Sequence, residues 1–166
     1  MNKTFLATLS LAVLTSGTFA FADQRDEQQA LAQSKISATE AVAIAEKASG
    51  ARANNLELDM KNGRAVFDLD LRNGHEEYDI HVDAVSGDII KNHHEHDDDQ
   101  AHNPGINMTQ AIAAAEKAVS AKVVDIELER TVQGLIYQVE LLGGNGERHY
   151  VDVDAADGKI LRGATP

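Results

Sequence analysis

The chain has 166 residues, of which 27 are Asp or Glu and 15 are Lys or Arg, so its formal net charge is −12 at pH 7. This balance excludes the basic surface that binding to nucleic acids or anionic membranes requires. The sequence contains no cysteine, which excludes disulfides, thiolate catalysis and Cys-type zinc sites. We therefore expect a protein held together by its core, with an acidic surface that favours cationic partners or metal ions.

Residues 1–22 have the organisation of a secretory signal peptide. Lys3 precedes an apolar run from Phe5 to Leu14, and the small residues that follow end in Ala20-Phe21-Ala22. The apolar run is too short to span a membrane, and the small residues match a cleavage pattern. We predict cleavage after Ala22 and a periplasmic mature protein without a membrane span, which begins with a polar segment over 23–35.

The rest of the chain is a tandem duplication. The stretch ISATEAVAIAEKA at 36–48 matches INMTQAIAAAEKA at 106–118 in eight of thirteen positions, and VDAVSGDI at 82–89 matches VDAADGKI at 153–160 in five of eight. Self-similarity of this kind indicates two copies of one structural unit. The predicted parts are a first domain over 36–92, a linker over 93–105 and a second domain over 106–163.

Each copy begins with a predicted helix. Ser37 and Glu40 have the spacing of a capping box, in which each side chain bonds to the backbone N–H of the other residue. Asn107 and Gln110 repeat the spacing in the second copy. The apolar stripe of both helices is mostly alanine, so each helix can lie close against a sheet.

Three alternating segments follow each helix. In the first copy, residues 56–60, 67–71 and 78–82 alternate between apolar and polar, which is typical of strands with one buried face. Asn62-Gly63 is a hairpin signal, and Ile89-Ile90 is expected to form a short closing strand. The predicted fold class is α+β, with two tandem repeats that each pack one helix on an antiparallel sheet of three to four strands. Copies of this size bury little surface alone, so we expect them to share contacts.

Both copies resemble the PepSY domain. The resemblance begins at the helix start, where the capping residue is followed three positions later by Glu-Ala or Gln-Ala, and includes the A-E-K-A end of the helix. It continues in the alternating strands and in the VDA-x-x-G hairpin, which an apolar pair follows. PepSY domains occur in propeptides of secreted metallopeptidases and as small exported proteins. The resemblance implies that the protein inhibits or regulates an extracytoplasmic peptidase.

The sequence contains none of the common catalytic patterns, such as G-x-S-x-G, HExxH or a P-loop. Asp83 and Asp154 correspond to each other in the two copies, but each is interpreted as a turn former. His75, His81 and His149 lack clustered partners along the sequence, so a structural role is favoured over a ligand role for all three. We predict that the protein is not an enzyme and requires no cofactor.

The joint between the copies is the stretch NHHEHDDDQAHNPG at 92–105. It has no apolar periodicity and three consecutive Asp residues, which favours a solvated, mobile spacer. Its histidines are also suitable ligands for Zn²⁺, Ni²⁺ or Cu²⁺, so a metal site is the alternative. The candidate ligands are His93, His94, His96 and His102.

Three functions are compatible with these observations. The favoured one is a non-enzymatic exported protein that binds an extracytoplasmic protein or peptide, for example a peptidase, by adding a strand to a sheet edge. The second is a periplasmic metal-binding or metal-buffering protein that uses the His/Asp-rich linker. The third is an accessory domain of an envelope sensor system.

Overall fold

The computed structural model describes residues 19–97 and 102–165, and these form one antiparallel sheet of eight strands with helices packed on it. The strand order is β4-β3-β2-β1-β5-β6-β7-β8, so each repeat supplies four consecutive strands. The predicted α+β repeats, each with one helix on an antiparallel sheet, are confirmed. The helices are α1 (Phe19–Gln33), α2 (Ala38–Ser49) and α3 (Met108–Ala118), and the strands are β1 (Arg52–Lys61), β2 (Arg64–Asn73), β3 (Glu76–Asp83), β4 (Ile89–His96), β5 (Lys122–Thr131), β6 (Gly134–Leu142), β7 (Arg148–Asp154) and β8 (Ile160–Thr165).

Both predicted capping boxes are present. The Ser37 hydroxyl accepts from the Glu40 N–H at 3.2 Å, and the Glu40 carboxylate accepts from the Ser37 N–H at 2.7 Å. Asn107 and Gln110 make the same pair of bonds, each at 2.9 Å. These bonds satisfy N–H groups that have no partner inside a helix, and each cap contributes about 1 kcal/mol.

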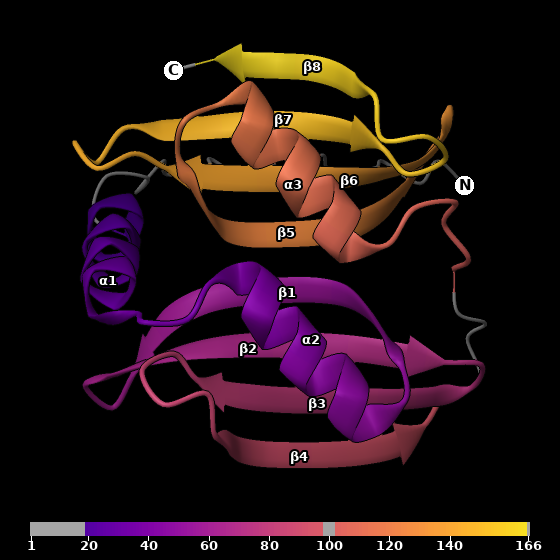
Figure 1. Cartoon of the computed structure of the whole chain (residues 1–166), viewed down its shortest axis with the longest axis horizontal. Coiled ribbons are helices and arrows are strands. Elements are labelled where there is room, and N and C mark those ends of the chain that lie inside the picture. Colours follow the sequence, from indigo (N-terminus) through magenta and orange to yellow (C-terminus); the bar gives the residue numbers. More distant parts are fainter. Residues whose placement is uncertain (1–18, 98–101, 166) are drawn as a thin grey trace, which may run out of the picture.

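The core lies between the sheet and the two repeat helices. Figure 1 shows α2 and α3 on the same face of the sheet, each running diagonally across the strands of its own repeat. Leu58 and Leu69 in the first repeat and Ile126 and Tyr137 in the second are fully or almost fully buried. The alternation of the strands places their polar residues on the opposite face, which neither α2 nor α3 covers and which we call the open face.

The two repeats are joined through β1 and β5, which pair antiparallel over three residues of each strand. The register places Leu56 opposite Ile126 at the centre of this short ladder. Shared contacts between the repeats were expected, but a continuous sheet was not. We call the β1–β5 ladder the seam.

Helix α1 covers most of the segment predicted only to be polar, and it also includes the predicted cleavage position after Ala22. It lies beside one end of the sheet, level with the seam (Figure 1). Ala30 is fully buried, and Leu31 packs against the core. The segment therefore belongs to the folded body. The apolar run from Phe5 to Leu14 lies outside the described residues, and none of the described helices is long and apolar enough to cross a membrane.

Strand β4 is longer than the Ile89-Ile90 pair predicted from the sequence. It runs to His96 and pairs with β3 at every residue except Ile90, where the register shifts, and the Asp97 N–H then donates to the His75 carbonyl at 2.7 Å. The prediction of a mobile spacer is therefore wrong for residues 93–97. The reason is that β3 offers a row of backbone groups that need partners, and any extended segment can supply them. Residues 98–101 of the expected linker lie outside the described residues.

Candidate functional site

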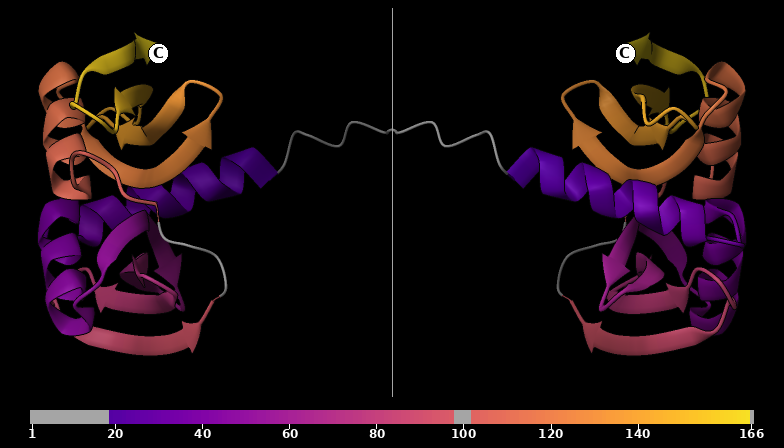
Figure 2. Two further views of the ribbon diagram at one scale, coloured as in Figure 1. Left: turned by 90° about the vertical axis from the view of Figure 1, so that its right-hand side faces the viewer. Right: turned by 90° about the vertical axis from the view of Figure 1, so that its left-hand side faces the viewer.

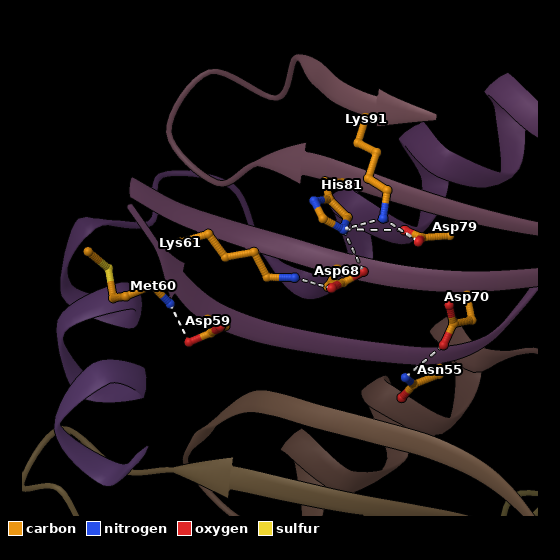
Figure 3. Close-up of polar contacts among 9 residues, drawn as sticks. All are labelled: Asn55, Asp59, Met60, Lys61, Asp68, Asp70, Asp79, His81 and Lys91. Atoms are coloured by element: carbon orange, nitrogen blue, oxygen red, sulfur yellow. Dashed lines mark hydrogen bonds and ion pairs between the residues drawn. The ribbon is translucent and has the colours of Figure 1, made fainter. Parts of the chain in front are cut away.

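A compact cluster of polar side chains lies on the open face of the first repeat. Asp68 on β2 is directly opposite His81 on β3, and Asp79 precedes His81 by two residues on the same strand. All three side chains therefore point to the same side of the sheet. Figure 3 shows them converging, with Lys61 and Lys91 at the sides.

The histidine nitrogen lies between the two carboxylates. His81 Nε2 is 3.2 Å from Asp68 Oδ1 and 3.3 Å from Asp79 Oδ1. The His81 side chain is only 16% exposed. Although Asp79 Oδ1 is close to the ring nitrogen, the oxygen is buried and makes no hydrogen bond. The cluster thus contains a carboxylate oxygen whose bonding capacity is unfilled.

Two lysines hold the outer oxygens of the same carboxylates. Lys61 pairs with Asp68 Oδ2, and Lys91 pairs with Asp79 Oδ2. Burial lowers the pKa of His81, and the two lysine charges lower it further against the opposing effect of Asp68 and Asp79. As the pH falls, the His81 imidazole therefore stays neutral to a lower pH than the imidazole of an ordinary histidine does.

The second repeat has no equivalent cluster. Gln138 and Asp152 form the pair that corresponds to Asp68 and His81, and Tyr150 stands in the place of Asp79. The sequence does not predict a site at His81, because Asp68 is distant along the chain and both aspartates occupy the polar positions of predicted strands. The available signal was the Asp-x-His spacing on one strand, combined with the hairpin register that brings Asp68 opposite.

The four histidines predicted as metal ligands fall in three places. His94 and His96 of β4 lie on the same face of the sheet as Glu76 of β3, whose carboxylate lies 2.5 Å from His94 Nε2 and 3.3 Å from His96 Nδ1. These two contacts lower the pKa of Glu76. His94 also stacks on Tyr78, with ring centroids 4.8 Å apart.

The other two predicted ligands are separate. His93 has the opposite phase on β4, so it lies on the open face, where its Nε2 is 3.7 Å from Glu95. His102 lies against the second repeat, with its Nδ1 3.1 Å from Arg130. The structure therefore does not bring the four predicted ligands to one site.

A second group of charges lies at the seam. Asp125 on β5 is half-buried and directly opposite Glu57 on β1. Burial raises the pKa of Asp125 to about 7, with further contributions from Glu57 and Glu140. Arg148 bridges this region to α1, because it pairs with Glu140 and, at 2.7 Å, with Glu27. The seam is thus rich in negative charge with one arginine as its neighbour.

A cleft of about 930 Å³ opens where the two repeats meet. The end of α2, the start of α3 and the first residues of β1 line it, together with His102 and the two residues that follow. Its wall includes Arg52, and its lining includes the buried ring of Tyr137. The cleft exists only because two repeats are joined, since both contribute to its walls.

Comparison with known proteins agrees with this architecture. The family model described as "Peptidase propeptide and YPEB domain" (PepSY) matches residues 35–93 and 105–163, so the chain belongs to the PepSY family and carries two tandem copies of the domain. The chain is 25% identical to the uncharacterized protein YkoJ of Bacillus subtilis (strain 168), over 98% of this chain and 96% of that protein.

Among solved structures, the chain is similar to CD1622 from Clostridium difficile 630, with a TM-score of 0.47 and 20% sequence identity. The similarity covers 77% of this chain and 91% of that one. The resemblance to PepSY inferred from the repeats is thus confirmed by the family match.

Proposed function

We propose that this protein is a non-catalytic extracytoplasmic regulator that binds an extended segment of a protein partner along a free sheet edge. Membership of the PepSY family supports a regulatory or inhibitory role outside the cytoplasm. The family description includes peptidase propeptides, so the partner we propose is an extracytoplasmic peptidase.

The observation that carries the proposal is the pair of uncovered outer strands. Within the described residues, no strand pairs with the outer edge of β4 or of β8. Such an edge presents N–H and C=O groups that an extended peptide can bond. Each edge also exposes an apolar side chain at an equivalent position, Ile90 at 44% and Leu161 at 54%. A bound strand could therefore gain both backbone bonds and apolar contacts.

The side chains of the described region support the absence of catalysis. The hydroxyl groups of Ser37 and Ser86 are engaged in a helix cap and a turn, and Ser49 donates to the Ala45 carbonyl at 2.9 Å. These bonds give the serines structural roles. Asp83 likewise accepts from the N–H groups of Val85 and Ser86, as expected for a turn former.

The test uses residues 23–166 with a photo-crosslinking residue at position 90 or position 161, and the exposed turn residue Val132 as the matched control. After exposure to an envelope fraction, we expect cross-links to a peptidase from the edge positions and none from position 132. Ile90→Lys or Leu161→Lys should also relieve inhibition of that peptidase while the fold, measured by circular dichroism, stays intact. Equal cross-linking from all three positions would contradict edge binding, and hydrolysis by the purified protein that one substitution abolishes would contradict the non-catalytic role.

Metal binding or buffering is the second candidate function. The observation that favours it is the Glu76 carboxylate, which lies within bonding distance of both His94 and His96 at the β4 edge. Imidazole and carboxylate groups together are ligands for Zn²⁺. Calorimetric titration with Zn²⁺ tests it, and the His93, His94, His96 and His102 to Ala variant serves as the comparison.

A further inference from the structure

We propose that Asp68, Asp79 and His81 form a binding site for one divalent transition-metal ion of the Zn²⁺ type on the open face of the first repeat. Of the β4 histidines, His93 shares the open face, where it is directly opposite Asp79, whereas His94 lies on the other face with Tyr78. The proposed site does not depend on the proposed edge binding. It uses residues from the middle of the sheet. Figure 3 shows the three side chains converging from β2 and β3.

The spacing of the three ligand atoms fits a small ion. His81 Nε2 lies 3.2 Å and 3.3 Å from the two Oδ1 atoms, and ligand atoms from all three residues lie within 4.8 Å of one another. An ion with tetrahedral bonds of about 2.0–2.1 Å holds its ligand atoms about 3.4 Å apart. The observed distances therefore need little adjustment for coordination.

The backbone already fixes the ligands in place. Asp68 and His81 are directly opposite each other in a regular ladder, and both β2 and β3 pair with neighbours on each side. A site built on paired strands loses little conformational entropy when the ion binds, because no flexible loop has to be ordered. Binding at the triad should therefore be favoured over binding by separate exposed histidines.

The charges of the two lysines balance those of the two carboxylates, and Lys91 Nζ also lies 3.5 Å from His81 Nε2, so a metal ion would have to displace Lys91 from the ring nitrogen. Lys61 and Lys91 bind the Oδ2 atoms and leave both Oδ1 atoms turned toward His81. Asp79 Oδ1 is buried without a hydrogen bond, which is costly for a carboxylate oxygen. A metal ion between the Oδ1 atoms and Nε2 would satisfy it. The lysines would then act as outer partners that orient the carboxylates.

The ligand set indicates the class of ion. One imidazole nitrogen with two carboxylate oxygens suits Zn²⁺ and its neighbours, whereas Mg²⁺ and Ca²⁺ prefer six or more oxygen ligands. Three protein ligands also leave a coordination position for water or for a donor atom of a partner. The site could thus add a metal-bridged contact on the open face.

The experiment titrates residues 23–166, stripped with EDTA, with ZnCl₂ by calorimetry in the presence of millimolar Mg²⁺. The triad variant is Asp79→Asn with His81→Gln. The matched control is Asp152→Asn, which removes one charge at the position that corresponds to His81 in the second repeat. The comparison variant replaces His94, His96 and His102 with Ala and keeps His93, because His93 is directly opposite Asp79. Melting of each metal-free variant verifies that it folds.

We expect one tightly bound Zn²⁺, with an affinity that falls about a hundredfold in the triad variant and stays unchanged in Asp152→Asn and in the three-histidine variant. Imidazole NMR signals of His81 should shift on addition of Zn²⁺, which identifies the site even if the triad variant is unstable. Unchanged uptake by a folded triad variant, loss of uptake in the three-histidine variant, or absence of binding by the wild type would each overturn the assignment.

Discussion

The charge crowding at the seam predicts that Asp125→Asn stabilises the protein at high pH. Asp125 is half-buried opposite Glu57, and burial together with neighbouring carboxylates raises its pKa to about 7. In the unfolded chain the group should have its ordinary pKa of 3.8. Between these two values the folded state binds more protons than the unfolded state, so stability falls as the pH rises from about 4 to about 7.

The full pKa difference corresponds to about 4 kcal/mol at 1.36 kcal/mol per pKa unit. Solvent reaches part of the half-buried side chain, which screens the neighbouring charges and reduces the expected effect to about 1–2 kcal/mol. Asparagine cannot ionise, so the variant should avoid this loss. Its advantage over the wild type should be smallest at pH 4, close to the unfolded pKa of 3.8, and should reach that value at pH 8.

The assay is urea unfolding of residues 23–166 at pH 4 and pH 8, followed by circular dichroism. Asp26→Asn is the control, because it removes the same charge at an exposed position of α1. A stability difference between Asp125→Asn and wild type that is equal at both pH values would refute the role of Asp125 ionisation at the seam.

Three further predictions concern stability. Leu69→Ala should lower the free energy of unfolding by about 2–5 kcal/mol, because Leu69 is fully buried. Val132→Ala, at an exposed turn, should change it by less than about 0.5 kcal/mol. Equal effects of the two substitutions in urea unfolding would contradict the assigned core. Arg148→Met should release α1, because Arg148 pairs with Glu27, and should therefore speed proteolysis of α1; cleavage at the wild-type rate would refute this anchor. Fragments 23–97 and 102–166 should each melt below the whole protein, since separation exposes the seam; cooperative melting of both at the temperature of the whole would show that the seam is dispensable.

Features set by short stretches of sequence were predictable. The Ser37–Glu40 spacing identified a capping box, and Asn62-Gly63 identified a hairpin whose two residues both have positive φ, 55° and 77°. Gly87 and Gly158, the glycines of the two VDA-x-x-G hairpins, also have positive φ, at 78° and 79°. The residues that determine each cap or turn lie within a few positions of one another, so the sequence pattern predicts the local conformation directly.

Features set by pairing between distant strands were not predictable. The polarity of His93 to His96 indicates solvent exposure, and β4 is indeed exposed, but polarity does not show whether an exposed segment finds a strand to pair with. The Asp68–His81 contact likewise depends on the register of β2 against β3.

The seam has the symmetry of a dimer interface. Leu56 and Ile126 occupy equivalent positions in the two repeats and face each other, and Glu57 faces the equivalent of Asn55, which is Asp125. The register therefore has a pseudo-twofold axis between Leu56 and Ile126, as in an isologous contact between identical subunits. A single PepSY unit with a similar first strand could make the same contact with a second copy of itself. In this chain the duplication makes that association permanent and independent of protein concentration, and each side of the axis is free to diverge, as the seam carboxylates and the one-sided Asp68, Asp79 and His81 cluster have done.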